Sequence, residues 1–248
     1  MSKSMVVAIT DFKNALKLRF IKMGMVMSAA FGPIMVIGMT VILAVSVPPS
    51  EFSMVTGFLV PMIGGFLGLF AIIPTTMISA NALVGEREMN TLEPLLCTPL
   101  TDRELLWGKT LASALPSLII LVSSVAATSI GTNVILFVLG YPLILIPDLP
   151  GFFLLATATP IMIFAIVAVM IIISGRVTRV YEAYQTASGV ILVFMIPLFL
   201  PLFGMGSSDA SYGWLSSIIT LLISAVLFAV AWFIAFRLFN RDKLVSMV

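Results

Sequence analysis

Lysine and arginine residues occur in four clusters that are separated by three long, almost uncharged apolar stretches. The clusters occupy residues 3–22, 87–109, 176–179 and 237–243. Apart from Glu86 and Glu182, which lie next to the clusters, each stretch contains a single acidic residue, which is Glu51, Asp148 or Asp209. About 20 apolar residues already cross the hydrocarbon core of a bilayer, so each stretch is too long for one crossing. The pattern therefore predicts three hairpins, each made of two membrane-spanning helices.

The composition excludes a soluble domain of ordinary type. Of the 248 residues, 60% are hydrophobic and 10% are charged, whereas soluble domains carry about 25% charged residues. So few polar side chains could not cover a globule of this size, and lipid must supply apolar surroundings. We therefore expect a single transmembrane domain over residues 1–248, with the fold class of an all-α membrane protein.

Proline- and glycine-rich turns beside the three acidic residues divide the stretches into six expected spans. These are roughly 23–47, 56–83, 105–130, 152–174, 185–204 and 214–238. All lysines and arginines then fall on one side, which is the cytoplasmic side by the positive-inside rule. We expect a multi-pass protein of the cell membrane with both termini in the cytoplasm. Because Gly131, Gly140, Pro142 and Pro147 interrupt residues 131–147, we expect an outer-leaflet re-entrant piece or an interfacial helix there.

The N-terminal segment, residues 1–22, is basic and amphipathic. Phe12 and Leu16 recur at helical spacing, and Lys13 and Lys17 lie one turn apart on another face. This pattern predicts an elbow helix in the headgroup layer, where cations meet anionic lipid. A solvated tail that only obeys the positive-inside rule is the alternative.

The second basic cluster contains a predicted helix–turn–helix at 84–100, between spans two and three. Within it, an apolar stripe at helical spacing consists of Met89, Leu92 and Leu96. A polar stripe, also at helical spacing, consists of Glu86, Asn90 and Glu93. These stripes predict a short amphipathic helix at the cytoplasmic face, which Thr98–Pro99 ends. An ordinary ordered loop is the alternative.

Thr101 and Glu104 match a capping box at the start of the next helix. The Thr101 hydroxyl can accept from the N–H of Glu104, and the Glu104 carboxylate can reach back to the N–H of Thr101. A second helix is therefore predicted to begin at residue 101 and to continue into the third span.

Small residues lie four apart in the first span, at Gly24, Ser28 and Gly32. Such a face lets helices approach closely. The spacing does not say whether the partner helix belongs to the same chain or to a second copy, so this is a candidate helix-packing face.

Several function classes lack the residues that they need. The chain has no histidine, and no acidic or basic residue lies deep in a predicted span, where ion-coupled carriers usually place them. No catalytic pair or metal-binding cluster is evident. Gly108-Lys109-Thr110 imitates the end of a phosphate-binding loop, but Arg103 stands where that motif needs glycine. We place Lys109 at the membrane interface instead.

The segment Gly85–Thr101, followed by Glu104–Lys109, resembles the type-2 family of ABC transporter permeases. That family carries a similar run of E-R/K-E, then T-L-E-x-L-L-x-T-P, then a hydrophobic pair and G-K before the third span. Residues 179–185 and 239–244 are also similar to the family pattern, and the six-span layout agrees along the whole chain.

The resemblance implies a permease subunit of an exporter, not an enzyme. Segment 84–100 would be the coupling helix that docks on an ATPase, through Glu86, Arg87, Glu88, Thr91, Leu92, Glu93, Leu96 and Pro99. Thr101 and Glu104 would cap it, and Phe12, Lys13, Leu16 and Lys17 would form the membrane-surface elbow. Two ABC ATP-binding subunits and a second permease, as a homodimer, are the implied partners. ATP and Mg²⁺ would be bound by the ATPases, this chain would bind no cofactor, and no nucleic acid is implied.

Two alternatives remain open from the sequence. One is a membrane subunit that binds an ATPase-like partner but transports nothing. The other is a self-contained channel or carrier, which would transport without any partner in liposomes.

Overall fold

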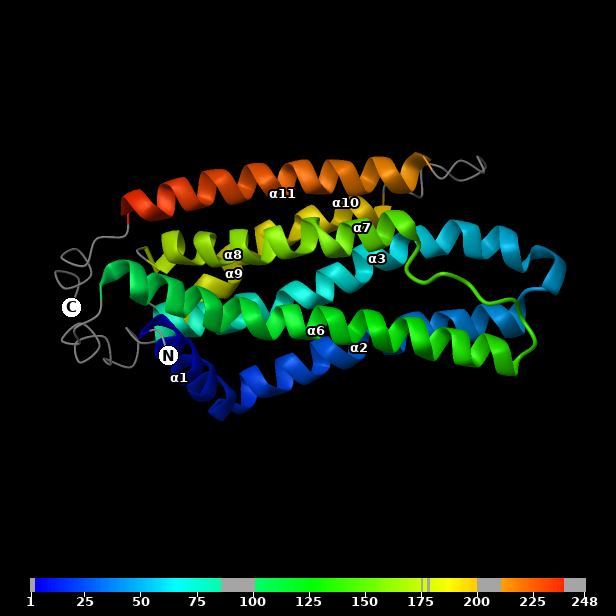
Figure 1. The fold of residues 1–248 in the computed structure, drawn as a ribbon, viewed down its shortest axis with the longest axis horizontal. Coiled ribbons are helices and arrows are strands. Elements are labelled where there is room, and N and C mark those ends of the chain that lie inside the picture. Colours follow the sequence, from blue (N-terminus) through cyan, green and yellow to red (C-terminus); the bar gives the residue numbers. More distant parts are fainter. Residues whose placement is uncertain (1–2, 86–100, 175, 178, 200–210, 239–248) are drawn as a thin grey trace.

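The computed structural model describes residues 3–85, 101–174, 176–177, 179–199 and 211–238. Within these ranges every regular element is helical, and the helices form one elongated bundle (Figure 1). In chain order they are α1 (Lys3–Lys17), α2 (Arg19–Ser46), α3 (Pro49–Ala80), the π-helical turn η1 (Asn81–Gly85), α6 (Asp102–Val138), α7 (Leu149–Ala156), α8 (Ala158–Ser174), α9 (Val180–Ile191), the 3-10 turn η2 (Leu192–Phe194), α10 (Met195–Phe199) and α11 (Ser211–Leu238). The all-α prediction is confirmed for the described residues.

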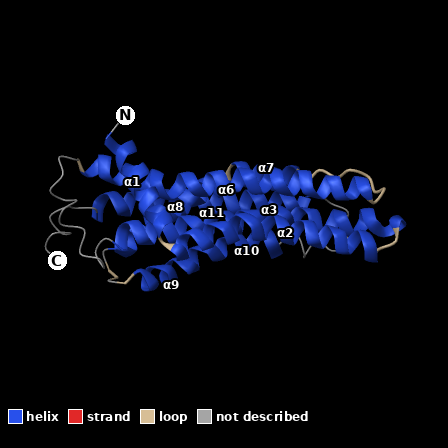
Figure 2. Cartoon of the chain, turned by 90° about the horizontal axis from the view of Figure 1, so that it is seen from below, coloured by secondary structure: helices blue, strands red, loops and turns tan. Residues whose placement is uncertain are grey.

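The helices run back and forth along the bundle as three hairpins. The first consists of α2 and α3, the second of α6 and α7–α8, and the third of α9–α10 and α11 (Figures 1 and 2). The elements that carry the described lysines and arginines meet at one end, on the left in Figure 1, which we call the basic end. Glu51 and Asp148 belong to the connections at the opposite end.

Five helices in the described residues are long and apolar enough to cross a bilayer. They are Arg19–Ser46, Val55–Ala80, Glu104–Val138, Leu149–Ser174 and Tyr212–Arg237. The predicted span at 185–204 falls on α9, η2 and α10, where a turn of tighter 3-10 helix separates two short α-helices. Its last residues lie outside the described part of the chain, so the sixth span stays a prediction.

The third span is longer than expected, because α6 continues through Gly131 to Val138. A Cβ atom on Gly131 would lie 2.6 Å from Ile37 Cδ1, so this glycine permits a close crossing with α2 and does not break α6. The helix ends instead at Gly140, which has a φ of 76°. Tyr141 N–H donates to Leu136 O at 2.9 Å, and Gly140 N–H donates to Phe137 O at 3.2 Å. This Schellman motif ends α6 inside the range 131–147. These described residues contain no separate interfacial helix, and a re-entrant piece stays a prediction.

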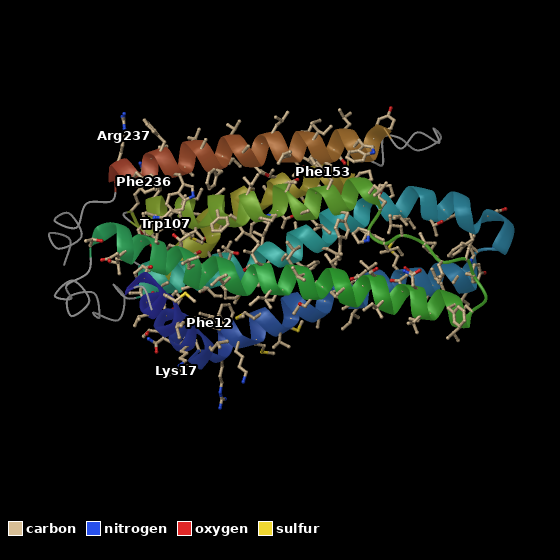
Figure 3. The ribbon with its side chains drawn as sticks, viewed as in Figure 1. Phe12, Lys17, Trp107, Phe153, Phe236 and Arg237 are labelled. Atoms are coloured by element: carbon tan, nitrogen blue, oxygen red, sulfur yellow. The ribbon has the colours of Figure 1, made fainter. Side chains whose placement is uncertain are left out.

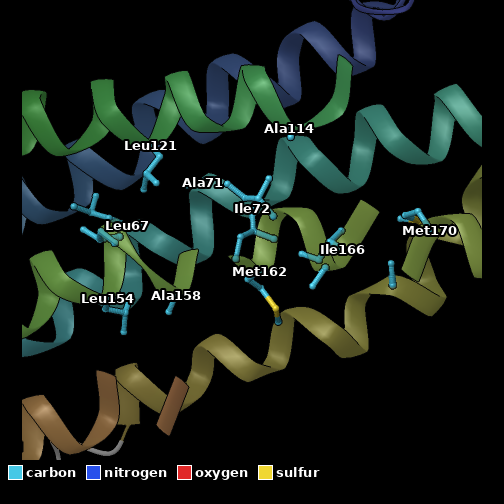
Figure 4. Close-up of a cluster of buried hydrophobic side chains, with 14 of the residues drawn as sticks. Leu67, Ala71, Ile72, Ala114, Leu121, Leu154, Ala158, Met162, Ile166 and Met170 are labelled. Carbon is cyan, nitrogen blue, oxygen red and sulfur yellow. The ribbon is translucent and has the colours of Figure 1, made fainter. Parts of the chain in front are cut away.

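The main hydrophobic core lies where α3, α6 and α8 meet (Figure 4). Its fully buried side chains include Leu67, Ile72, Met162, Ile166 and Met170. Of the five long helices, Leu149–Ser174 has the largest buried share, whereas α2 and α11 expose most of their apolar side chains. An apolar outer surface of this kind requires lipid or another membrane protein around it.

The small-residue face of α2 packs on α3 of the same chain. A Cβ atom on Gly24 would lie 2.4 Å from the side chain of Met77, and one on Gly32 would lie 3.3 Å from Leu67. Between them, the Ser28 hydroxyl donates to the carbonyl of Phe70. Of the two partners that the sequence left open, the structure shows the one within the chain.

The Ser28 hydroxyl should contribute modestly to this packing. We expect Ser28→Ala to lower the stability of the bundle by about 0.6 kcal/mol, since buried hydrogen bonds between membrane helices average that value. Ser123→Ala is the matched control, because the exposed Ser123 hydroxyl donates to Ile120 O within its own helix. Thermal melting of both variants in detergent measures the difference, and equal melting temperatures would contradict the assignment.

Candidate functional site

The segment predicted to contact an ATPase lies along the chain between the π-helical turn η1 and the first turn of α6. All eight residues predicted to contact an ATPase fall at 86–100, outside the described residues. The chain enters this segment from η1 at Gly85 and leaves it at Thr101. The structure therefore describes the two ends of the segment and what holds them.

The exit from the segment is the capping box predicted from the sequence. Glu104 N–H donates to Thr101 Oγ1 at 3.3 Å, and Thr101 N–H donates to Glu104 Oε2 at 2.9 Å. The two bonds satisfy backbone donors that the first turn of a helix otherwise leaves without partners. The capping box thus fixes the residue at which α6 begins, and from there the helix continues without interruption into the bundle.

Removal of the cap should loosen this point. We expect Thr101→Ala to cost about 1 kcal/mol of local stability, because the Glu104 N–H loses its acceptor. Hydrogen–deuterium exchange in the first turn of α6 should become faster. Thr186→Ala is the control, since the exposed Thr186 hydroxyl donates to Glu182 O in its own helix. Unchanged exchange at residues 102–105 would contradict the prediction.

The N-terminal helix α1 packs across the beginning of α6. Gly108 permits this contact, because a Cβ atom there would lie 2.8 Å from Val7 Cβ and 2.9 Å from Ser4 O. On α1, the buried side chains facing the bundle are small: Val7, Ala8 and Ala15. The N-terminal segment is therefore helical over Lys3–Lys17, and protein holds this helix along one face. Residues 19–22, which we expected in the same helix, belong to α2.

The four elbow residues divide between two environments on α1. Phe12 and Leu16 are half-buried, whereas Lys13 and Lys17 are exposed. Lys17 extends away from the bundle in Figure 3. The exposed apolar residues Met5, Val6 and Ile9 lie on the same helix. This mixture suits the headgroup layer of a membrane, and the membrane-surface role of α1 stays a prediction.

A buried ion pair joins α1, η1 and α6. Lys109 has only 5% of its surface exposed. Its Nζ donates to the carbonyl of Ala82 in η1 at 2.6 Å and lies 3.8 Å from Asp11 Oδ2 in α1. Because α1 and η1 cover Lys109, its side chain packs against protein, and its depth at the membrane interface stays a prediction. Sequence reasoning missed this contact, although Asp11 is the only acid among the first 22 residues.

Burial and the lysine act on Asp11 in opposite directions. Desolvation by burial raises the pKa of the Asp11 carboxyl, and the positive charge of Lys109 lowers it by a smaller amount. Oδ2 is buried and accepts no hydrogen bond from the described residues. The carboxylate therefore depends on Lys109 for compensation of its lost hydration.

Tyr184 ties the beginning of α9 to the end of α3. Its hydroxyl donates to Met77 O at 3.2 Å, and its ring lies 6.2 Å from that of Phe20 in α2. Burial raises the pKa of Tyr184 to about 12, so the hydroxyl keeps its proton and donates at neutral pH. Val180, in the same helix, lies close to Gly85 of η1. The third hairpin thus also contacts the entry to segment 86–100.

Tryptophans mark two levels along the bundle. At the basic end, Trp107 stacks on Trp232 with ring centroids 5.9 Å apart, beside Phe236 and Arg237 (Figure 3). At the other end, Trp214 contacts Phe153, with centroids 5.7 Å apart. Trp214 and Trp232 are separated along α11 by about 27 Å at 1.5 Å per residue, close to the roughly 30 Å of a hydrocarbon core.

Tryptophan is enriched at both membrane interfaces, so these levels suit the two headgroup regions. Thr101 and Glu104 precede Trp107 on α6. Within the described ranges, no group of three or more histidine, cysteine or acidic residues is placed to hold a metal ion. The arrangement is suited to transmit movement from segment 86–100 to α3 and α6, which begin or end there.

Residues 5–210 match the family model described as ABC-2 family transporter protein. The matched range covers most of the chain, including segment 86–100, the capping box and the ion pair. No curated protein matches the sequence.

Proposed function

Because this chain belongs to the ABC-2 family of transporter proteins, and is thus a membrane permease, we propose that it forms the translocation path of an exporter driven by a separate ATPase. The chain itself is a transport subunit. In the proposal, ATP and Mg²⁺ bind to the ATPase. This chain supplies the translocation path and the segment that transmits movement of the ATPase to the spans. The uncharged spans favour a hydrophobic or amphipathic substrate.

The observation that carries the coupling proposal is how the two ends of segment 86–100 are held. Its entry, η1, is bonded to α6 through Lys109 and Ala82 O at 2.6 Å. Its exit, Thr101, is the cap of α6. A displacement of the segment by a docked ATPase would therefore move α3 and α6 together as rigid helices, the kind of shift that alternates access to a path. Glu86, Arg87, Glu88 and Glu93 are the proposed charged contacts.

The proposed orientation places the basic end in the cytoplasm. The described lysines and arginines lie on elements that meet there, and cytoplasmic loops are enriched in such residues. Segment 86–100 would then face the compartment that supplies ATP. Both termini would be cytoplasmic, and α1 would lie at the inner surface of the cell membrane.

The proposed working unit contains two permeases and two ATPases, with the path between the permeases. The apolar outer faces of α2 and α11 are available for lipid or for the second permease. The small-residue face of α2 is not, because α3 of the same chain occupies it.

Co-purification tests the proposed coupling. The chain is expressed with a candidate cassette ATPase, as wild type and with Glu88→Lys and Glu93→Lys combined. We expect the wild type to retain the ATPase and the double charge reversal to lose it. Glu51→Lys is the control, since Glu51 is exposed at the opposite end of the bundle. If the folded wild type binds no ATPase and transports alone in liposomes, the self-contained carrier replaces this proposal.

A further inference from the structure

We propose that α2 bends at Pro33 during transport, and that the Ser124 hydroxyl of α6 holds this bend in the state that the structure shows. Ser124 is then a positioning residue, which acts through the backbone of α2. The structural part of the proposal stands on the contacts of this chain alone. Its consequence for transport rests on the proposed function.

The first argument is a backbone carbonyl that a proline leaves without its helical donor. Pro33 lies inside α2, and proline has no N–H to donate to the carbonyl four residues earlier. That carbonyl is Ala29 O, and it accepts a hydrogen bond from Ser124 Oγ at 3.4 Å. Backbone groups at membrane depth need a partner from protein, and here the neighbouring helix supplies it.

The second argument is that the same arrangement occurs in α3. Pro74 lies inside α3 and leaves Phe70 O without its helical donor. The Ser28 hydroxyl of α2 donates to Phe70 O. Ser28 directly precedes Ala29, so α2 donates to one freed carbonyl and offers the other at the same level. Each freed carbonyl is thus occupied by a serine of an adjacent helix.

A third hydrogen bond between hydroxyl groups closes a ring around α2, α3 and α6. Thr75, next to Pro74, donates to Ser117 Oγ of α6 at 2.7 Å. Ser124 already joins α6 to α2, and Ser28 joins α2 to α3. All of these hydroxyl side chains are buried. The ring therefore fixes the three helices to one another beside the two prolines, where a helix bends most easily.

The course of α2 agrees with a bend inside the helix. In Figure 1, α2 rises away from α1 and then runs nearly level toward the opposite end of the bundle. Sharp changes of direction within a helix occur mainly at proline, and Pro33 lies near the middle of α2. The part of α2 beyond Pro33 can therefore change its angle while the first part stays packed on α3.

An unpaired hydroxyl faces this outer part of α2. Thr128 follows Ser124 by one helical turn, on the face of α6 where Gly131 meets Ile37. It is fully buried, and its Oγ1 has no hydrogen-bond partner among the described residues. A buried hydroxyl without a partner disfavours the state that contains it. A different angle at Pro33 would let Thr128 gain a partner or water, which favours a second state.

Spin-label distances within α2 test the structural part in the chain alone. Labels on Met27→Cys and Ile42→Cys lie on either side of Pro33 at exposed positions. The native thiol is removed by Cys97→Ser. We expect one narrow distance distribution in this background, because the bend has one angle while Ser124 holds it.

Two neighbouring serines give a matched pair of variants. Ser124→Ala should broaden the distribution, because Ala29 O loses its donor and the bend is no longer held. Ser123→Ala is the control and should leave the distribution narrow, since the Ser123 hydroxyl donates to Ile120 O within α6. A Ser124→Ala distribution that matches that of Ser123→Ala would overturn the proposal.

Pro33→Ala shows whether Ser124 acts through the freed carbonyl. Alanine restores the N–H that Ala29 O lacks, so α2 should straighten and the mean distance between the labels should increase. In this background Ser124→Ala should no longer broaden the distribution. An unchanged mean distance, or equal broadening in both backgrounds, would overturn the proposal. If Pro33→Ala does not fold, the comparison of Ser124→Ala with Ser123→Ala decides alone.

The complex with the ATPase tests the consequence for transport. Pro33→Ala should still co-purify with the ATPase, because segment 86–100 is unchanged. Its ATP-driven transport should fall by about tenfold, within the usual range of coupling between sites, whereas Ser123→Ala should transport as the wild type does. Unchanged transport in a variant whose label distance has increased would overturn the consequence. Failure of the wild type to bind any ATPase would instead remove the proposed function and leave the bend as measured.

Discussion

Gly64→Leu should prevent α3 and α7 from packing, whereas Gly57→Leu on the same helix should leave the bundle intact. A Cβ atom on Gly64 would lie 2.6 Å from Gly151 Cα and 3.1 Å from Gly151 O. These are backbone atoms, which cannot rotate away as a flexible side chain would. Overpacking a well-packed site usually costs about 1–3 kcal/mol, and a backbone collision should lie at or above the upper end of that range.

Gly57 is a matched control because it is a glycine of the same helix as Gly64 and differs from Gly64 in its surroundings. It is exposed, and a Cβ atom there would meet nothing within 4 Å. Alanine at an exposed helical glycine usually stabilises by about 0.5–1 kcal/mol. Gly57→Ala should therefore raise the melting temperature in detergent, and Gly64→Ala should lower it. Shifts of the same sign in the two variants would contradict the close crossing of α3 and α7.

Gly108→Leu should separate α1 from α6 while the long helices stay folded. The new side chain would collide with Val7 Cβ, at 2.8 Å from its own Cβ, and with the backbone of Ser4, at 2.9 Å. A single extended residue, Leu18 (φ −78°, ψ 114°), separates α1 from α2, so the collision should be relieved by movement of α1. We expect a loss of about 1–3 kcal/mol of α1 packing.

Hydrogen–deuterium exchange measures this effect helix by helix. In Gly108→Leu, the amides of α1 should exchange about 5- to 150-fold faster, the factor that corresponds to that free energy. The amides of α8, at the centre of the bundle, should not change. Gly189→Leu, at an exposed glycine with nothing within 4 Å, is the control. Faster exchange throughout the bundle would show that Gly108 supports the whole fold and not α1 alone.

Features that depend on local spacing were predictable from the sequence. The capping box needs only a threonine and a glutamate three residues apart, and both bonds are present. The distribution of charges predicted the direction of the first two hairpins, because Glu51 and Asp148 lie at the end opposite to the described lysines and arginines. The amphipathic helix at the N-terminus followed from its periodicity in the same way.

Features that depend on contacts distant in sequence were not predictable. The sequence interpretation takes Gly131 as a helix break. A glycine that ends a helix and a glycine that lets the Ile37 side chain approach at a helix crossing cannot be distinguished by sequence. Gly24, Ser28 and Gly32 form a close-packing face whichever helix occupies it, so only the structure identifies α3 as the partner. Asp11 and Lys109 lie on helices that the sequence separates by two spans, and no spacing rule connects them.

The apolar run at 185–204 illustrates a different limit. Its composition suits a membrane span, and hydropathy responds to composition alone. The structure divides the run into α9, η2 and α10, so its hydrogen bonding changes along its length. Regular helix geometry and apolar composition are separate properties, and the sequence establishes only the second.

ATP hydrolysis in liposomes tests the central claim most directly. The permease and its ATPase are reconstituted together, and the rate is measured with and without a panel of amphipathic compounds. We predict that at least one compound changes the rate, and that the combined Glu88→Lys and Glu93→Lys substitutions abolish this response. The hydrolysis rate of the ATPase alone is measured beside that of its stable complex with the permease. Equal rates with every compound would contradict the claim that this chain couples the ATPase to transport.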